Sequence, residues 1–386
     1  MKIAVIGGGP AGLFFARLMK RSHLGVEIRI FEQNPADATY GFGVTLAGPA
    51  RDRLHRADPE LHDQLVANMV LNNRQDIELN GERIPLEYAA SGGAIARLAL
   101  LGILENLCRQ AGLEVDHNRR VDMPRELGSY DLIVGADGAN SAVRNAFSDE
   151  FGVRARTLNN RFAWYGVRKA LKPNALVFRT FEGGCYVAHY YAYAPTMSTF
   201  VAECDGATWD RCGLSQLTDA QRKAQIEHVF ADVLEGEPLV ENKSLWRAFV
   251  ATTTERWTTS NVALIGDALR VAHFSIGSGT RLAMDDALAL HEALCEPGIS
   301  LPSALNRYVE RRKPVRDLFT EATVRSFEWY EEMRSAMQSN PIDFAHGFLT
   351  RTGRIKDDRL MTYVPTFYER LVAHRSAADG NITEPS

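Results

Sequence analysis

The chain has 386 residues and a formal net charge of −4, because 44 lysines and arginines stand against 48 aspartates and glutamates. At roughly 150 residues per domain, this length predicts about two to three domains or one large composite domain. The balanced charge argues against a nucleic-acid-binding protein, which normally carries a basic excess. The five cysteines contain no C-x-x-C pair, which favours a reducing compartment and excludes a disulfide framework or a cysteine-based zinc site.

The beginning of the chain indicates where the protein works. Its first residues run directly into an apolar stretch, Lys2–Ile6, with no basic region and no small-residue cleavage site before it. No apolar run approaches the roughly 20 residues of a membrane-spanning helix. We therefore expect a cytoplasmic protein, a monomer or a homodimer, that binds neither a membrane nor nucleic acid and holds no metal.

The first predicted elements form a nucleotide-binding pattern. Lys2–Ile6 is typical of a strand buried on both faces of a parallel sheet, and 13–21 has helical spacing. Between them lies G-x-G-x-x-G, in which the first glycine permits a tight turn, the second lets a pyrophosphate approach and the third lets helix and strand pack. The helix start also offers N–H groups to phosphate. The residues concerned are Gly7, Gly9, Pro10, Ala11 and Gly12.

An acidic residue ends the next predicted strand. This strand spans 26–31, and Glu32, followed by Gln33, lies twenty residues after Gly12. A carboxylate at this position can accept hydrogen bonds from ribose hydroxyls and would repel a 2′-phosphate. The pattern predicts dinucleotide binding but does not separate NAD from FAD. The alternative is a glycine-rich turn in an ordinary βαβ unit.

Two later motifs repeat the design of an apolar strand that ends in glycine and aspartate. The first, after 130–134, contains Asp137 and Gly138, and the second, after 261–265, contains Gly266 and Asp267. An aspartate at the end of a strand can hold a ribityl hydroxyl. Each motif alone is equally compatible with an Asp-Gly turn of no further function.

A glycine-rich loop follows the second motif and precedes a helical stretch over 282–294. The start of such a helix can present N–H groups to phosphate or to a developing flavin anion. The loop residues are Gly277, Ser278, Gly279 and Thr280.

Taken in order, the three motifs resemble the single-component FAD-dependent aromatic hydroxylases related to para-hydroxybenzoate hydroxylase, over residues 1–330. The resemblance implies an α/β fold: a Rossmann-like FAD-binding domain with an inserted antiparallel β-sheet substrate domain and C-terminal helices. We expect the FAD-binding domain at 1–71, 92–158 and 260–330, and the substrate domain at 72–91 and 159–259. A helical region would follow at 331–375, and a disordered tail at 376–386.

The resemblance also implies roles for single residues. Arg97 would reach the FAD pyrophosphate or ribose, and adenine would lie against a short strand near Val121. Asp137 would lie near the pyrophosphate and the nicotinamide donor, and Asp267 would bind the ribityl chain. The glycines at 277 and 279 would lie beside the isoalloxazine.

The chemistry implied by the resemblance belongs to the cofactor. FAD would stay bound, NADH or NADPH would bind transiently and reduce it, and O₂ would form a C4a-hydroperoxide that transfers oxygen to an activated small aromatic substrate. The other function left open is a flavin-binding scaffold or a chaperone of a biosynthetic intermediate.

Some segments narrow the resemblance. The stretches 161–166, 176–180, 187–189, 196–204 and 272–277 look like the violacein-pathway tryptophan hydroxylase, and 277–284 is similar to salicylyl-CoA and 2-aminobenzoyl-CoA hydroxylases. These enzymes share an electron-rich ring with an ortho amino or hydroxyl group, or an indole. The substrate, and whether it is free, CoA-linked or carrier-linked, stays open.

The predicted antiparallel sheet over 162–205 supplies candidate substrate residues. Strand alternation places His189, Tyr191 and Tyr193 on one side. Arg179 could neutralise a carboxylate or form a surface ion pair, and each aromatic residue could equally be core. His273 is the candidate catalytic residue, since it replaces a family proline next to the isoalloxazine. Further candidate substrate residues are Trp164 and Phe274.

Overall fold

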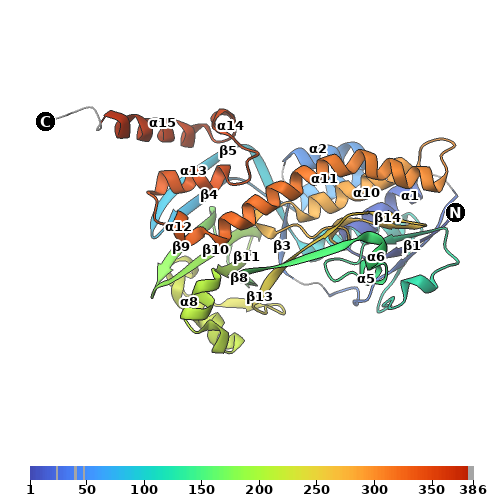
Figure 1. Cartoon of the computed structure of the whole chain (residues 1–386), viewed down its shortest axis with the longest axis horizontal. Coiled ribbons are helices and arrows are strands. Elements are labelled where there is room, and N and C mark those ends of the chain that lie inside the picture. Colours follow the sequence, from blue (N-terminus) through green and yellow to red (C-terminus); the bar gives the residue numbers. More distant parts are fainter. Residues whose placement is uncertain (23–24, 39–40, 47, 381–386) are drawn as a thin grey trace.

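The computed structural model describes residues 1–22, 25–38, 41–46 and 48–380 and contains two sheets with helices packed on them (Figure 1). The first is a six-stranded sheet in the order β14-β15-β7-β1-β2-β6, parallel except for β14. Its strands are β1 (Lys2–Ile6), β2 (Glu27–Phe31), β6 (Val115–Asp116), β7 (Leu132–Gly135), β14 (Thr258–Thr259) and β15 (Val262–Leu264).

This sheet is covered on both faces, which explains its apolar strands. Residues 3–6 of β1 are at most 4% exposed, as expected for a parallel strand between helical layers. Helix α1 (Pro10–Arg21) packs against α4 (Arg97–Gln110) and α10 (Gly279–Leu294). The predicted strand–turn–helix unit is therefore confirmed, with the helix starting at Pro10.

The second sheet has nine strands and is antiparallel except where β4 pairs with β9. Strands β4 and β5 form a hairpin, and its Asn80-Gly81 turn has two positive φ angles, 49° and 91°, as tight hairpin turns require. The strands are β3 (Gly43–Leu46), β4 (Val70–Leu79), β5 (Glu82–Ala96), β8 (Val153–Val167), β9 (Asn174–Phe181), β10 (Gly184–Ala194), β11 (Met197–Cys204), β12 (Leu239–Glu241) and β13 (Arg247–Thr254).

Helices cover both faces of this second sheet. On one face, Ile226 and Phe230 pack with sheet residues such as Tyr165. On the other face, Phe344 and Phe348 pack with the sheet residue Phe178. The first group is α7 (Gly206–Arg211), α8 (Asp219–Val229) and α9 (Ala231–Leu234). The second is α12 (Met333–Ala336), α13 (Pro341–Thr350), α14 (Asp357–Tyr363) and α15 (Pro365–Gly380).

The remaining helices lie in or between the two halves. Helix α11 (Leu301–Glu331) runs along the molecule from the first sheet to the second (Figure 1). The short helices α2 (Gly48–Ala57), α3 (Pro59–Ala67), α5 (Ala142–Ala146) and α6 (Ser148–Phe151) accompany the first sheet. The predicted α/β fold with an antiparallel sheet insertion is confirmed, whereas the domain boundaries stay a prediction.

Pro314 lies inside α11, which is one continuous element. Two local predictions need correction. Residues 376–380 continue α15 instead of forming a disordered tail, and 381–386 lie outside the described residues. Val121 lies in the loop that follows β6, because the only strand formed there is the two-residue β6.

Within the described parts of the chain, every helix is too short or too polar to cross a membrane.

A buried cluster of charges joins the second glycine–aspartate motif to α10 and α11. The Asp286 side chain is fully buried, and its two oxygens accept from Arg312 Nε at 2.7 Å and from the Gly266 N–H at 3.1 Å. Arg316 Nε lies 3.4 Å from the same carboxylate, and its Nη2 donates to the carbonyls of Gly266 and Arg270. Asp286 therefore holds Gly266 in two ways: directly through the Gly266 N–H, and through Arg316, which donates to the Gly266 carbonyl.

Replacing Asp286 by asparagine removes the counter-charge of Arg312 and Arg316 inside the protein. Because an uncompensated buried charge is costly, we expect the free energy of unfolding to fall by about 3–5 kcal/mol, measured by urea denaturation. The control is Glu310→Gln, which breaks an exposed pair with Arg307 on α11 and should cost less than about 1 kcal/mol. Equal losses in the two variants would contradict this role of Asp286.

Candidate active site

The turn after β1 requires glycine at two positions. A Cβ on Gly7, whose φ is +111°, would lie 2.4 Å from the Ala136 carbonyl oxygen, and one on Gly12 would lie 2.1 Å from the Gly7 carbonyl oxygen. In contrast, a Cβ on Gly9 would have no heavy atom within 4 Å. The first and third glycines thus allow close packing, and the second faces open space at the N-terminus of α1, where a pyrophosphate fits.

Glu32 lies beside this turn. Its Oε2 accepts from the Gly8 N–H at 2.8 Å, and its Oε1 accepts from the Asn34 N–H at 2.8 Å. The neighbouring Gln33 is exposed. The carboxylate is therefore held at the end of β2 against the glycine turn, as the ribose-binding role predicts.

Asp137 has a different environment. Its carboxylate accepts from the N–H groups of Ala142 at 2.7 Å and Val143 at 3.2 Å and from the Ser141 hydroxyl, so it caps α5. Burial raises its pKa, while these hydrogen bonds oppose the change. Gly138 follows with a φ of +78° and open space at its Cβ position. The Asp137 side chain is thus used inside the protein, and its predicted position near the pyrophosphate stays a prediction.

Arg97 and Asp267 bring opposite charges into the same half-buried region. Burial lowers the pKa of Arg97, whereas the charge of Asp267 favours its protonated form. Burial also raises the pKa of Asp267, against the positive charges of Arg316, Arg97 and Arg144. A polar cofactor could replace the water lost by both groups, which matches their predicted contacts with FAD.

The glycine loop before α10 touches β3. The Thr45 hydroxyl donates to the Gly277 carbonyl at 3.3 Å, and Gly277 has a φ of +55°. Ser278 precedes α10, Thr280 lies in its first turn, and a Cβ on Gly279 would have no atom within 4 Å. Open backbone at three glycine positions and nearby opposite charges therefore fit FAD along this edge of the first sheet.

Aromatic rings form a wall between the glycine loop and the second sheet. The Phe274 ring lies 4.7 Å from Phe162, 5.3 Å from Trp164 and 5.8 Å from His189, measured between centroids. Trp164, His189 and Phe274 thus lie close together, and their contact with a substrate stays a prediction. We call Phe162, Trp164, His189, His273 and Phe274 the aromatic wall.

His273 lies in the wall as a neutral ring. It is 3% exposed, and burial lowers its pKa to about 4. Its Nδ1 accepts from the Ser275 N–H at 3.3 Å and lies 2.8 Å from the Ser275 hydroxyl. These contacts hold the loop that precedes Gly277, so they favour a positioning role over acid–base catalysis for His273.

The two tyrosines support β3. The Tyr191 hydroxyl donates to the Gly43 carbonyl at 2.7 Å, and a Cβ on Gly43 would lie 2.7 Å from the Tyr193 ring. Both residues therefore hold the strand that contacts the glycine loop, and the structure gives neither a place in the aromatic wall.

Arg179 departs from the prediction of substrate contact. On β9 it lies opposite Tyr186, whereas His189 lies opposite Leu176, so alternation puts Arg179 and His189 on opposite faces. Its guanidinium pairs with Glu78 at 2.6 Å and Asp232 at 2.5 Å. The ion-pair alternative is therefore the one that the structure contains.

Sequence reasoning missed Glu203, which lies in the apolar strand β11 and is 1% exposed. Its Oε1 accepts from Asn160 Nδ2 at 2.9 Å, and its Oε2 lies 3.5 Å from His189 Nε2. Neither of these last two atoms has a hydrogen-bond partner among the described residues. The signal in the sequence was a single acidic residue inside an apolar strand, since a buried carboxylate without a structural partner is rare.

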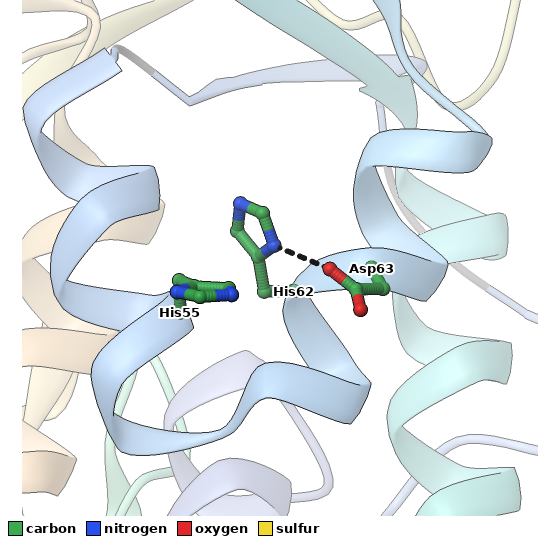
Figure 2. Close-up of side chains that lie close together, drawn as sticks. All are labelled: His55, His62 and Asp63. Carbon is green, nitrogen blue, oxygen red and sulfur yellow. Dashed lines mark hydrogen bonds and ion pairs between the residues drawn. The ribbon is translucent and has the colours of Figure 1, made fainter.

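A second cluster of possible metal ligands lies away from the aromatic wall. Figure 2 shows His55 on α2 beside His62 and Asp63 on α3, with ligand atoms within 4.8 Å of one another. The sequence predicts no metal site, and His62 Nδ1 already lies 2.8 Å from the Asp63 carboxylate. His55 and Asp63 are exposed, and exposed groups of this kind are common without an ion. We assign the cluster no role.

Comparison with known proteins agrees with this geometry. A family profile described as an FAD binding domain matches residues 115–323. In solved structures, the chain is similar to the tetrameric form of 2-methyl-3-hydroxypyridine-5-carboxylic acid oxygenase, with a TM-score of 0.71 and 20% identity over 91% of this chain and 95% of that one. This likeness concerns the fold.

Relatives of higher identity span most of the chain. The salicyloyl-CoA 5-hydroxylase of a Streptomyces species is 36% identical over 91% of this chain and 70% of its own length. The 3-hydroxy-4-methyl-anthranilyl-[aryl-carrier protein] 5-monooxygenase of Streptosporangium sibiricum is 35% identical over 92% and 95%. The protodeoxyviolaceinate monooxygenase of Chromobacterium violaceum is 32% identical over 91% and 94%. The chain therefore belongs to the family of FAD-dependent aromatic monooxygenases.

Proposed function

We propose that the protein hydroxylates an electron-rich aromatic ring with an ortho hydroxyl or amino group, at the aromatic wall. FAD, reduced by NADH or NADPH, supplies the oxygen-transfer chemistry with O₂ when it is bound. The observation that carries the choice of substrate is the pair of half-buried His189 and buried Glu203 beside a wall of aromatic rings. The names of the hydroxybenzoyl- and anthranilyl-specific relatives support the same class of ring.

The aromatic wall would position the ring and exclude water. Phe274 and Trp164 offer faces and edges for stacking against an aromatic substrate. They also lie on the path from the second sheet to the glycine loop, because Phe274 is three residues before Gly277. A substrate bound there would lie between the sheet and the flavin loop.

His189 would accept a proton from the substrate hydroxyl, or a hydrogen bond from a substrate amine. Glu203 lies nearest to His189 Nε2, so a proton on Nε2 leaves Nδ1 free to act as the acceptor. The carboxylate then stabilises the imidazolium, and Asn160 holds the carboxylate in place. Loss of this proton makes the ring more electron-rich, which favours oxygen transfer to its carbon. The separation of 3.5 Å between His189 Nε2 and Glu203 Oε2 does not argue against this role, because catalytic hydrogen bonds are often long in structures without substrate.

The expected flavin contacts can be tested by removing two carboxylates. Glu32→Ala and Asp267→Ala should each weaken FAD binding at least tenfold, because each loses hydrogen bonds from a charged acceptor to a sugar or ribityl hydroxyl, worth about 1.5–3 kcal/mol. Titration of apoprotein with FAD, followed by flavin fluorescence, measures this. Glu114→Gln removes an exposed acid near the same sheet and should change nothing. Normal affinity in both alanine variants would refute the assignment.

The proposed proton acceptor can be tested by His189→Gln and Glu203→Gln. We expect kcat for hydroxylation of a salicylate- or anthranilate-type substrate to fall by about 10²–10⁴, with normal FAD content. With a phenolic substrate, raising the pH should partly restore the rate of His189→Gln, because the phenol then ionises without a base. The matched control is His228→Gln, on α8 at the opposite face of the same sheet. Failure of high pH to restore any activity would indicate a merely structural role.

A further inference from the structure

We propose that a cavity between α1, α2 and α10 binds the phosphate group of an extended ligand. The ligand is the CoA or phosphopantetheine arm of a thioester-linked aromatic substrate, or the diphosphate of the nicotinamide nucleotide. The proposal rests on the proposed function and adds to it a second recognition site, outside the aromatic wall.

The cavity is lined by both apolar and charged side chains. Its apolar lining includes Phe14 of α1, Leu54 of α2 and Met284 of α10. Three arginines line it as well, Arg51 and Arg53 from α2 and Arg281 from α10, together with one carboxylate, Asp285. The three arginines and the one aspartate give the lining a formal charge of +2, so the site is suited to an anion that carries more than one negative charge.

Only one of the three arginines, Arg53, forms hydrogen bonds with a carboxylate. Arg53 donates to both oxygens of Asp285, at 3.1 and 3.0 Å. Arg281 Nη1 lies 3.8 Å from the same carboxylate, which is beyond hydrogen-bond distance. Asp285 is thus used by Arg53, and its charge is only partly available to the other two.

Arg51 and Arg281 keep unused donors. Arg51 Nη2 donates to the Ser91 carbonyl at 2.7 Å, but its Nε is buried without a partner. The Arg281 guanidinium lies 4.3 Å from the Phe319 ring centroid, and no hydrogen bond joins it to any residue that the structure describes. Because a buried donor without an acceptor is costly, Arg51 is suited to an acceptor from outside the chain, and Arg281, which lines the same cavity, can donate to the same acceptor.

The surroundings of Arg281 point to the same conclusion. Its side chain is 13% exposed. Burial lowers the pKa of Arg281 to about 10, and the charges of Arg53, Arg312 and Arg354 act in the same direction, with Asp285 opposing. A bound phosphate would relieve this crowding of positive charge.

The cavity lies next to the glycine loop but on the other side of β3. Thr45 donates to the Gly277 carbonyl, and Leu46, the following residue, lines the cavity. Successive residues of a strand point to opposite faces. Residues of the aromatic wall do not line this cavity. An anion bound here therefore belongs to an arm extending from the ring or to the second substrate, and not to a substituent on the ring itself.

The relatives give a reason to consider the arm. Salicyloyl-CoA and an anthranilyl group on an aryl-carrier protein are named as their substrates. Both molecules place phosphate at a distance from the aromatic ring. The nicotinamide nucleotide also carries a diphosphate, so the experiment must separate the two sources.

The test uses the flavin-loaded protein and its Arg51→Gln and Arg281→Gln variants, with Arg56→Gln as control. Arg56 is exposed on α2, the helix of Arg51, and lies outside the cavity. The control therefore removes one positive charge, as each cavity variant does. Isothermal titration with coenzyme A, NADH and inorganic diphosphate measures binding without turnover. We expect at least one of the two nucleotides to bind about tenfold more weakly to each cavity variant, and normally to Arg56→Gln. Arg281→Lys, which keeps the charge, should recover part of the loss.

Steady-state kinetics identify the source of the phosphate. If the ligand is the thioester, KM for salicyloyl-CoA should rise about tenfold in the cavity variants while KM for free salicylate and for NADH stays constant. If the ligand is the nucleotide, KM for NADH or NADPH should rise alone. An equal rise for free salicylate, or no change in either affinity or KM, would overturn the proposal. Failure of the wild-type holoprotein to hydroxylate any aromatic ligand would overturn the proposed function instead.

Discussion

A single buried carboxylate holds the flavin-binding half of the protein together. Asp286 neutralises two arginines of α11 and accepts the N–H of Gly266. It does so from the middle of α10, the helix that begins at Gly279 in the glycine loop. The positions of the Gly266–Asp267 turn, of α10 and of α11 therefore all depend on one charge. Because a charge this deep must be compensated, the positions of these three elements cannot vary independently.

The proposed chemistry depends on how the second sheet meets this framework. β3 is the link, because Thr45 contacts the glycine loop while Gly43 accepts from Tyr191 and packs against Tyr193. The two tyrosines, expected to bind substrate, instead fix the strand that lies between the sheet and the loop. In the proposed function, substrate recognition is therefore left to the side chains that cluster around Phe274.

The sequence predicted the nucleotide-binding half well, because its motifs are local. Gly7 and Gly12 are required by contacts within one strand–turn–helix unit, and such contacts have a fixed spacing. The substrate face was predicted less well, because it depends on pairing between strands. Arg179 lies opposite Tyr186 and so faces away from His189, and a shift of one residue would have reversed this. Glu203 meets His189 and Asn160 only across neighbouring strands, which no spacing along the chain reveals.

The unbroken course of α11 has a mechanical consequence. Arg316, near the Gly266 turn, and Tyr330, stacked on His189 at 5.3 Å, belong to the same helix and are about 21 Å apart along its axis. Because one continuous helix makes both contacts, the positions of the Gly266 turn and of His189 are coupled. The two halves are thus expected to move together. A change of substrate preference during evolution would then be easiest at side chains of the aromatic wall, because it leaves the distance between these two contacts of α11 unchanged.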